Sequence, residues 1–138
     1  MDTDTRIRDF LAESRFAVAG ASSNRAKYGN KVLRCYLQHG RDAVAIHPHE
    51  TEVEGVPAYA RLADVPETPG ALSIITPPPV TERLVEEAAA AGIRHVWMQP
   101  GAESPAAVAR AEEAGLNVIH GGACLLVVLR YKESYRDR

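Results

Sequence analysis

Residues 20–24 form a short run of small and polar side chains that could hold a phosphate group. The run reads Gly20, Ala21, Ser22, Ser23 and Asn24. It follows an apolar segment and precedes an amphipathic one, so it stands where a strand would lead into a helix. Free N–H groups and the helix dipole favour an anion at such a place. Arg25 and Lys27 add positive charge. The run predicts a phosphate-binding loop, and a loop that only turns tightly is the simpler alternative.

The same loop departs from the dinucleotide-binding fingerprint GxGxxG. The next glycine after Gly20 is Gly29. An NAD site also needs an acidic residue at the end of the second strand to bind the ribose hydroxyls. That position reads His47-Pro48-His49, with Glu50 beyond it. A neutral or cationic pair of histidines suits a phosphorylated ribose or a bulkier nucleotide better than it suits NAD, so NAD is disfavoured. An NADP(H)-binding, redox-sensing module remains an alternative.

Three consecutive prolines, residues 77–79, follow an apolar segment that ends at Thr76. Proline has no N–H group and a fixed φ, so the run can neither extend a sheet ladder nor bind an anion. It would form a rigid apolar wall beside the phosphate loop. Pro79 can also open the following helix, where the missing N–H costs nothing. A run that only fixes the strand-to-helix turn is the alternative.

The histidines and cysteines do not form a recognisable catalytic or metal motif. Three histidines and a cysteine follow expected strands and could share one edge of the sheet, but no standard zinc-ligand spacing supports a metal site. They are His47, His49, His120 and Cys124. The sequence places no acidic partner beside His120, which favours a structural or ligand-contacting role over catalysis. Cys35 and Cys124 form no CxxC pair and are expected to be reduced thiols. We assign no catalytic residue and no metal ligand.

Alternating apolar and amphipathic segments must position these residues. Strands are expected at 16–20, 43–48, 71–76, 93–99 and 116–120. Helices are expected at about 5–13, 28–39, 79–91 and 104–114, with a short one within 59–64. Three helices end at a glycine shortly before a strand, at Gly40, Gly92 and Gly115. This rhythm predicts an α/β fold, a Rossmann-like doubly wound parallel five-stranded sheet with helices on both faces.

In such a sheet, ligands bind beyond the carboxyl ends of the strands, at the topological switch point. The segments that follow the five expected strands should therefore line one edge. They read GASSNRAKYGNK, HPHE, TPPPV, MQPGAES and HGGAC.

Length and composition fit one ordinary domain over residues 1–138, with a core of about 14–127. The chain has 138 residues, of which 46% are hydrophobic and 25% charged, and its net charge of −2 gives no general attraction to nucleic acid or anionic membranes. No apolar run approaches the ~18 residues of a membrane span. The acidic, polar start MDTDTRIRDF is unlike a signal peptide, so a cytoplasmic location is expected.

Several segments together resemble a known family. They are VAGASSNRAKYGNKV, AIHPHETEVEGVPAYARLADVP, IITPPPVTERLVEEAAAAGIRHVWMQPGAES and AGLNVIHGGACLL. They are similar to the small stand-alone CoA-binding proteins, which are related to the nucleotide-binding N-terminal domain of the succinyl-CoA synthetase α chain and of ADP-forming acyl-CoA synthetases. The resemblance covers about residues 14–127, and the proline run and WMQPGAES are its most specific parts.

The resemblance implies coenzyme A bound across the strand ends. Phosphate contacts would come from Gly20, Ala21, Ser22 and Lys27, with Tyr28 shaping the same pocket. Pro48 would lie by the ribose or adenine. Thr76, Pro77 and Pro78 would flank the adenine or the pantetheine arm, and the far side would be lined by Met98, Gln99 and Gly101. Relatives often carry Lys where this chain has His49, and a neutral His49 would weaken a contact with a ribose phosphate and make it pH-dependent.

The resemblance implies binding without catalysis, because the phosphorylated histidine of the synthetases lies in a later domain. We expect a carrier, sensor or partner module for CoA or an acyl-CoA, and a homodimer on base rates alone. An enzyme acting on a CoA thioester through His120 or Cys124 is an alternative. A pure interaction domain is another, with the charged tail at 129–138 as a docking segment.

Overall fold

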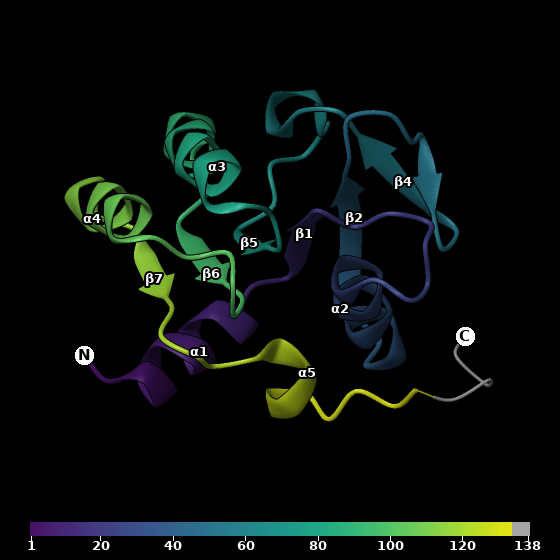
Figure 1. The fold of residues 1–138 in the computed structure, drawn as a ribbon, viewed down its shortest axis with the longest axis horizontal. Coiled ribbons are helices and arrows are strands. Elements are labelled where there is room, and N and C mark those ends of the chain that lie inside the picture. The colour runs from purple at the N-terminus through teal and green to yellow at the C-terminus, as the bar shows by residue number, and fades with distance from the viewer. Residues whose placement is uncertain (134–138) are drawn as a thin grey trace.

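A seven-stranded sheet runs through the computed structural model, which describes residues 1–133 (Figure 1). The strand order is β3-β4-β2-β1-β5-β6-β7. The strands are β1 (Arg15–Ala19), β2 (Asp42–Ile46), β3 (Glu52–Val53), β4 (Val56–Tyr59), β5 (Ala71–Ile74), β6 (His95–Met98) and β7 (Asn117–Ile119). All neighbouring pairs are parallel except β3 with β4, which is antiparallel. The doubly wound α/β class is thus confirmed.

The sheet has two more strands than the five expected. β3 and β4 form a hairpin at one edge, with Val53 paired to Val56 across a two-residue turn. The turn residues Glu54 and Gly55 both have positive φ, 51° and 82°. The sequence did not predict this hairpin for two reasons. β3 is only two residues long, and β4 contains Pro57, whereas proline within a segment usually argues against a strand. Pro57 is tolerated because β2 pairs with β4 only at Ala58 and Tyr59, beyond the proline.

The helices lie close to their expected ranges. They are α1 (Thr3–Leu11), α2 (Tyr28–Gln38), α3 (Pro78–Ala91), α4 (Pro105–Glu113) and the short α5 (Leu125–Val128), with a 3-10 helix at Leu62–Asp64. The side chain of Ser104 caps α4 by accepting a hydrogen bond from the amide of Ala107. Gly92 ends α3 with a φ of 87°. The sequence analysis did not predict α5, because four apolar residues carry no helical period.

Two apolar layers enclose the sheet, and the residues of each strand alternate between them. Figure 1 shows α3 and α4 on one face and α1, α2 and α5 on the other. Along β6, Val96 and Met98 pack toward α3 and α4, whereas Trp97 packs with the opposite cluster. The Trp97 ring meets Phe10 of α1 edge to face at 5.3 Å, and its indole N–H donates to the carbonyl of Ala123. Both faces of the sheet are therefore buried, as the uniformly apolar strands predict.

The backbone is most crowded where the strand order reverses, between β1 and β5. A Cβ atom on Gly20, whose φ is +98°, would lie 2.0 Å from the carbonyl oxygen of Ile75. A Cβ atom on Gly29, in the first turn of α2, would lie 2.1 Å from the carbonyl oxygen of Gly20. The β1–α2 loop is thus held between the end of β5 and the start of α2. Both glycines are needed for this close approach.

The C-terminal segment packs back on α2 of the same chain as far as the structure describes it. The amide and carbonyl of Lys132 pair with the side chain of Gln38. Glu133 lies 3.1 Å from the Lys31 ammonium. The expected docking tail at 129–138 extends beyond this, and residues 134–138 lie outside the described part. Within residues 1–133, no helix has the length and apolar character needed to cross a membrane.

The crowding at Gly29 predicts a stability effect. Gly29→Ala should lower the free energy of unfolding by about 1–3 kcal/mol, because the new methyl group meets backbone that cannot move aside. Gly70→Ala is the matched control, since its Cβ would meet only the flexible side chain of Glu13. Urea unfolding of both variants measures the difference. Equal midpoints for the two variants would contradict a rigid switch point.

Candidate functional site

Two cavities lie along the carboxyl ends of the central strands, at the switch point. The larger has a volume of about 520 Å³ and is bordered by the ends of β1 and β2 and by α3. The smaller, about 300 Å³, lies at the ends of β5 and β6. Thr76 and Pro77 line both cavities, so the two are neighbours across this pair of residues. This is where a doubly wound sheet is expected to bind a ligand.

The larger cavity combines apolar walls with two arginines and one glutamate, Glu87. Its lining includes Gly20, Ile46, Pro48, Val80 and Leu84. Arg61 and Arg83 also line it. The Arg61 guanidinium forms an exposed ion pair with Asp64 at 3.0 Å, and the Arg83 guanidinium forms one with Glu87 at 3.2 Å. The sequence analysis missed both arginines, because neither follows one of the five expected strands. Arg83 lies one helical turn after the proline run, and this spacing could have indicated that its side chain lies near the same end of the sheet.

The proline run fixes the turn from β5 into α3 and also presents an apolar surface beside the cavities. Pro77 caps α3, and its carbonyl accepts the amides of Val80 and Thr81. Pro78 and Pro79 occupy the first positions of the helix, where no N–H is needed. The hydroxyls of Thr76 and Thr81 lie 2.8 Å apart, which ties the turn to the helix. The run therefore fixes the turn and also leaves Pro77 exposed as a wall between the two cavities.

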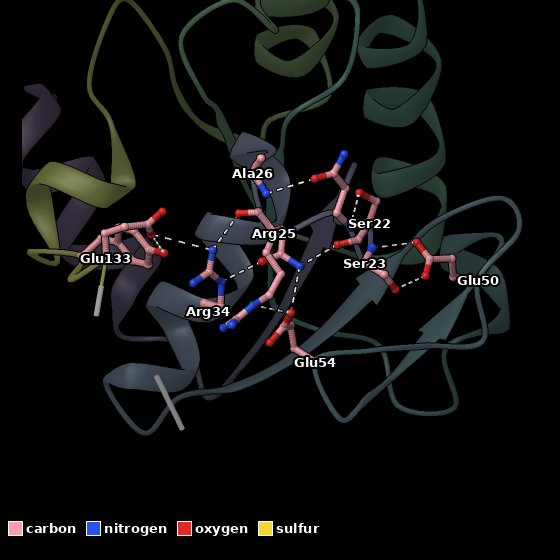
Figure 2. A network of polar contacts seen from close by, with 11 residues as sticks. Ser22, Ser23, Arg25, Ala26, Arg34, Glu50, Glu54 and Glu133 are labelled. Carbon is pink, nitrogen blue, oxygen red and sulfur yellow. Dashed lines mark hydrogen bonds and ion pairs between the residues drawn. The ribbon is translucent and has the colours of Figure 1, made fainter. Parts of the chain in front are cut away.

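The β1–α2 loop already binds an anionic group of the protein (Figure 2). The carboxylate of Glu50 accepts hydrogen bonds from the amide of Ser23, at 2.7 Å, and from the Ser23 hydroxyl. These bonds hold the pKa of Glu50 below its usual range. The Nδ1 atom of His47 accepts the amides of His49 and Glu50, so its proton lies on Nε2, 3.8 Å from the Glu50 carboxylate. An acidic side chain after the second strand thus does reach the loop.

A second glutamate ties the same loop to the hairpin that the sequence did not predict. Glu54, at the turn between β3 and β4, lies 3.2 Å from the Arg25 guanidinium and accepts a hydrogen bond from Asn30. Asn30, fully buried, also donates to the carbonyl of Ser22. Arg34 then bonds Asn30 and the carbonyl of Arg25 (Figure 2). Two glutamates and this pair of α2 side chains therefore hold the loop in one conformation.

A third polar group lies at the end of β6, where Tyr28, Gln99 and Cys124 meet. The Tyr28 hydroxyl is 2.8 Å from the Cys124 sulfur and donates to Gln99 Oε1 at 3.1 Å. The amide of Leu125 also donates to Gln99 Oε1, at 2.9 Å. Burial and the contact with Cys124 raise the pKa of Tyr28 above its usual range. The sequence proposed Tyr28 and Gln99 for one site, and the structure brings them into contact.

The remaining expected site residues fall into different environments. Gly20, Pro48, Thr76 and Pro77 line the larger cavity, and Gly101 lines the smaller one with Pro100. Lys27 and His49 are exposed and line neither cavity. Ser22 and Pro78 are half-buried, and Ala21 and Met98 are fully buried in the two cores. His120 lies elsewhere, in a groove along α4 with Glu112. Over residues 1–133, no three histidine, cysteine or acidic side chains are arranged to hold a metal ion.

Comparison with known proteins places this arrangement in a family. Residues 14–130 match the family model described as a CoA binding domain. A conserved hypothetical protein from Pyrococcus furiosus is 34% identical, with a TM-score of 0.78 over 83% of this chain and 97% of that chain. A hypothetical protein from Pyrococcus horikoshii OT3 is 26% identical, with a TM-score of 0.83 over 92% and 89%. These likenesses span nearly the full length of both relatives.

A larger enzyme contains a similar unit. The dinucleotide-forming acetyl-coenzyme A synthetase 1 of Ca. Korarchaeum cryptofilum is 26% identical, with a TM-score of 0.67. The match covers 76% of this chain but only 25% of the synthetase. This chain therefore resembles one part of that enzyme. The resemblance stated from the sequence is confirmed.

The contact between Glu50 and Ser23 predicts a pH dependence. Because the pKa of Glu50 is lowered in the folded protein, the contact should persist below about pH 4.3, the ordinary glutamate pKa, and be lost as the pH falls through the lowered value. The Ser23 amide signal in a ¹H–¹⁵N NMR titration should report that step. The Ala26 amide, which donates to the uncharged Asn24 side chain, is the internal control. A Ser23 midpoint at or above the ordinary value would contradict the contact.

Proposed function

This chain belongs to the family of CoA-binding domains, and from that premise we propose that it binds coenzyme A or an acyl-CoA along the carboxyl edge of its sheet. The observation that carries the proposal is the pair of cavities that meet at Thr76 and Pro77. Coenzyme A has a charged nucleotide end and a long, mostly apolar arm. It therefore needs two adjoining compartments of different character.

The larger cavity suits the nucleotide end. Its walls are largely apolar, with Ile46, Pro48 and Leu84 available to pack against a base. Arg61 and Arg83 stand at the same cavity and can meet phosphate charge. Arginine offers a fork of donors that matches phosphate geometry, so these two side chains can bind phosphate oxygens. We assign the principal phosphate contacts to this pair, with Lys27 beside the loop.

The smaller cavity suits the pantetheine arm. From the nucleotide cavity, the arm would cross Thr76 and Pro77 and enter the space bounded by Pro100, Gly101 and Ala102. The flat, donor-free surface of Pro77 favours an aliphatic chain over an anion. Gln99 directly precedes this cavity wall in the chain. The ligand would thus run from the end of β2 to the end of β6.

The C-terminal half of the β1–α2 loop is already engaged by contacts within the protein. Four amides between residues 23 and 27 already donate within the protein: those of Ser23, Asn24, Ala26 and Lys27. A phosphate at Ser23 would have to displace Glu50. Gly20, Ala21 and Ser22, which the sequence named for phosphate contacts, are not among these four, and Gly20 lines the larger cavity. In this proposal the protein acts as a binding module for the ligand, as a carrier, sensor or partner.

Calorimetric titration of the ligand-free protein with CoA, dephospho-CoA, NAD and NADPH tests this proposal. We expect micromolar binding of CoA and no comparable binding of NAD. The variant Arg61→Gln/Arg83→Gln should bind CoA about 10- to 100-fold more weakly, since a hydrogen bond to a charged group contributes about 1.5–3 kcal/mol.

The control is Arg94→Gln, an exposed arginine just before β6, at the opposite edge of the sheet. It should bind CoA as the wild type does. Clear NADPH binding without CoA binding would overturn the proposal in favour of a redox-sensing module. Binding of CoA that the double variant leaves unchanged would place the phosphates elsewhere.

A further inference from the structure

The cluster of Tyr28, Gln99 and Cys124 contains more chemistry than ligand binding requires. Cys124 is half-buried at the start of α5, and its sulfur contacts the Tyr28 hydroxyl at 2.8 Å. The same hydroxyl is bound to Gln99 Oε1. A thiol, a phenol and a carboxamide thus lie within two hydrogen bonds of one another. Of these, the thiol is the only nucleophile of the three at neutral pH.

Gln99 carries a buried donor that the protein leaves unused. Its Oε1 accepts the amide of Leu125, which can only donate, so the orientation of the carboxamide is fixed. Its Nε2 is buried and has no hydrogen-bond partner within residues 1–133. A buried unpaired donor costs about 1–3 kcal/mol and is rare in folded proteins. The group therefore points to an acceptor that arrives with a ligand.

Chain connections link the cluster to the cavity proposed for the pantetheine arm, although none of its three side chains lines that cavity. Gln99 is followed directly by Pro100 and Gly101, which line that cavity. The carboxylate of Glu103 accepts the amide of Gly101 at 3.0 Å and that of Gly121 at 2.9 Å. This bridge holds the segment that leads to Cys124 against the same turn. The reactive end of a bound acyl-CoA would therefore approach this cluster.

We propose that Cys124 is an acyl-acceptor site, which takes the acyl group from an acyl thioester bound at the strand edge. The inference rests on the proposed binding function. The Cys124 thiolate attacks the carbonyl carbon, a new carbon–sulfur bond forms to the protein, and the carbon–sulfur bond to the ligand breaks. The ligand leaves as a thiolate and takes up the proton that Cys124 gave up. One thioester replaces another, and no oxidant or reductant is consumed.

Each member of the cluster has a defined part in this step. The unpaired Gln99 Nε2–H group donates to the thioester carbonyl oxygen, where negative charge develops. The Tyr28 hydroxyl donates to Gln99 and accepts from the Cys124 thiol, which holds the sulfur in place. Because reactant and product are both thioesters, the extent of acylation follows the ratio of acyl-CoA to free CoA. The site would therefore report that ratio reversibly.

Cys35 provides a built-in comparison. It is fully buried in α2, and burial raises the pKa of its thiol to about 12. It should therefore stay unmodified in the folded protein. Two cysteines in one chain thus differ in the single property that the proposal needs, access to a ligand.

Mass spectrometry of the full chain incubated with acetyl-CoA tests the inference. We expect a mass increase of one acetyl group, mapped to the Cys124 peptide and absent from Cys35. Neutral hydroxylamine should remove it, and excess free CoA should reverse it. The labelling rate should saturate with acetyl-CoA. Calorimetry with acetyl-CoA on the same preparation measures binding separately.

Two variants examine the roles within the cluster. Cys124→Ser should give no hydroxylamine-sensitive label. Gln99→Glu keeps an acceptor oxygen for Leu125 but removes the free donor, so the labelling rate at saturating acetyl-CoA should fall about a hundredfold, as for loss of an oxyanion donor. A change only in the half-saturating concentration would indicate a binding role for Gln99 and overturn its part in the step. Thermal unfolding of each variant verifies that it is folded.

The outcomes separate the inference from the proposed function. Acetyl-CoA binding without a label on Cys124 would overturn the inference and leave the binding function standing. No acetyl-CoA binding would overturn the binding function and the inference with it. A label that does not saturate, or that appears equally on Cys35, would indicate non-specific acetylation and would also overturn the inference.

Discussion

The close approach of three backbone segments at the switch point is the constraint on which the rest of the structure depends. Gly20 lies against the carbonyl of Ile75, and Gly29 lies against the carbonyl of Gly20. Neither approach leaves room for a side chain, so β1, α2 and the end of β5 are fixed relative to one another. Both cavities open beside this contact, because Gly20 lines one and Ile75 lines the other. The shape of the site is therefore set by backbone packing.

Polar contacts extend that constraint to the edge of the sheet. The β1–α2 loop is bound by Glu50, which follows β2, and by Glu54, at the turn of the β3–β4 hairpin. Glu54 has a positive φ of 51°, which is uncommon outside glycine, and its side-chain contacts with Arg25 and Asn30 offset that cost. The hairpin thus contributes to the position of a loop that lies two strands away in the sheet.

The sequence predicted what depends on local pattern. Apolar runs, the glycines after the helices and the Ser104-Pro105 cap predicted five of the seven strands and four helices, because each follows from neighbours a few residues apart. The hairpin and Arg61 were missed for a different reason. Val53 and Val56 form a strand pair only because β2 offers an edge, and Arg61 reaches the cavity only because β4 returns the chain beside β2. Such placements depend on tertiary contacts that no local pattern encodes.

The position of Glu50 changes how the glycine loop should be understood. The sequence suggested that residues 20–24 supply donors to a phosphate, yet the Ser23 amide and hydroxyl already serve an internal carboxylate. These contacts hold the Ser23 part of the loop in place before any ligand arrives, which lowers the entropy cost of ordering it on binding. Arg61 and Arg83 are both exposed and both border the larger cavity. In the proposed function, positive charge would therefore come from these two side chains as well as from the loop, whose backbone packing sets the shape of the cavity.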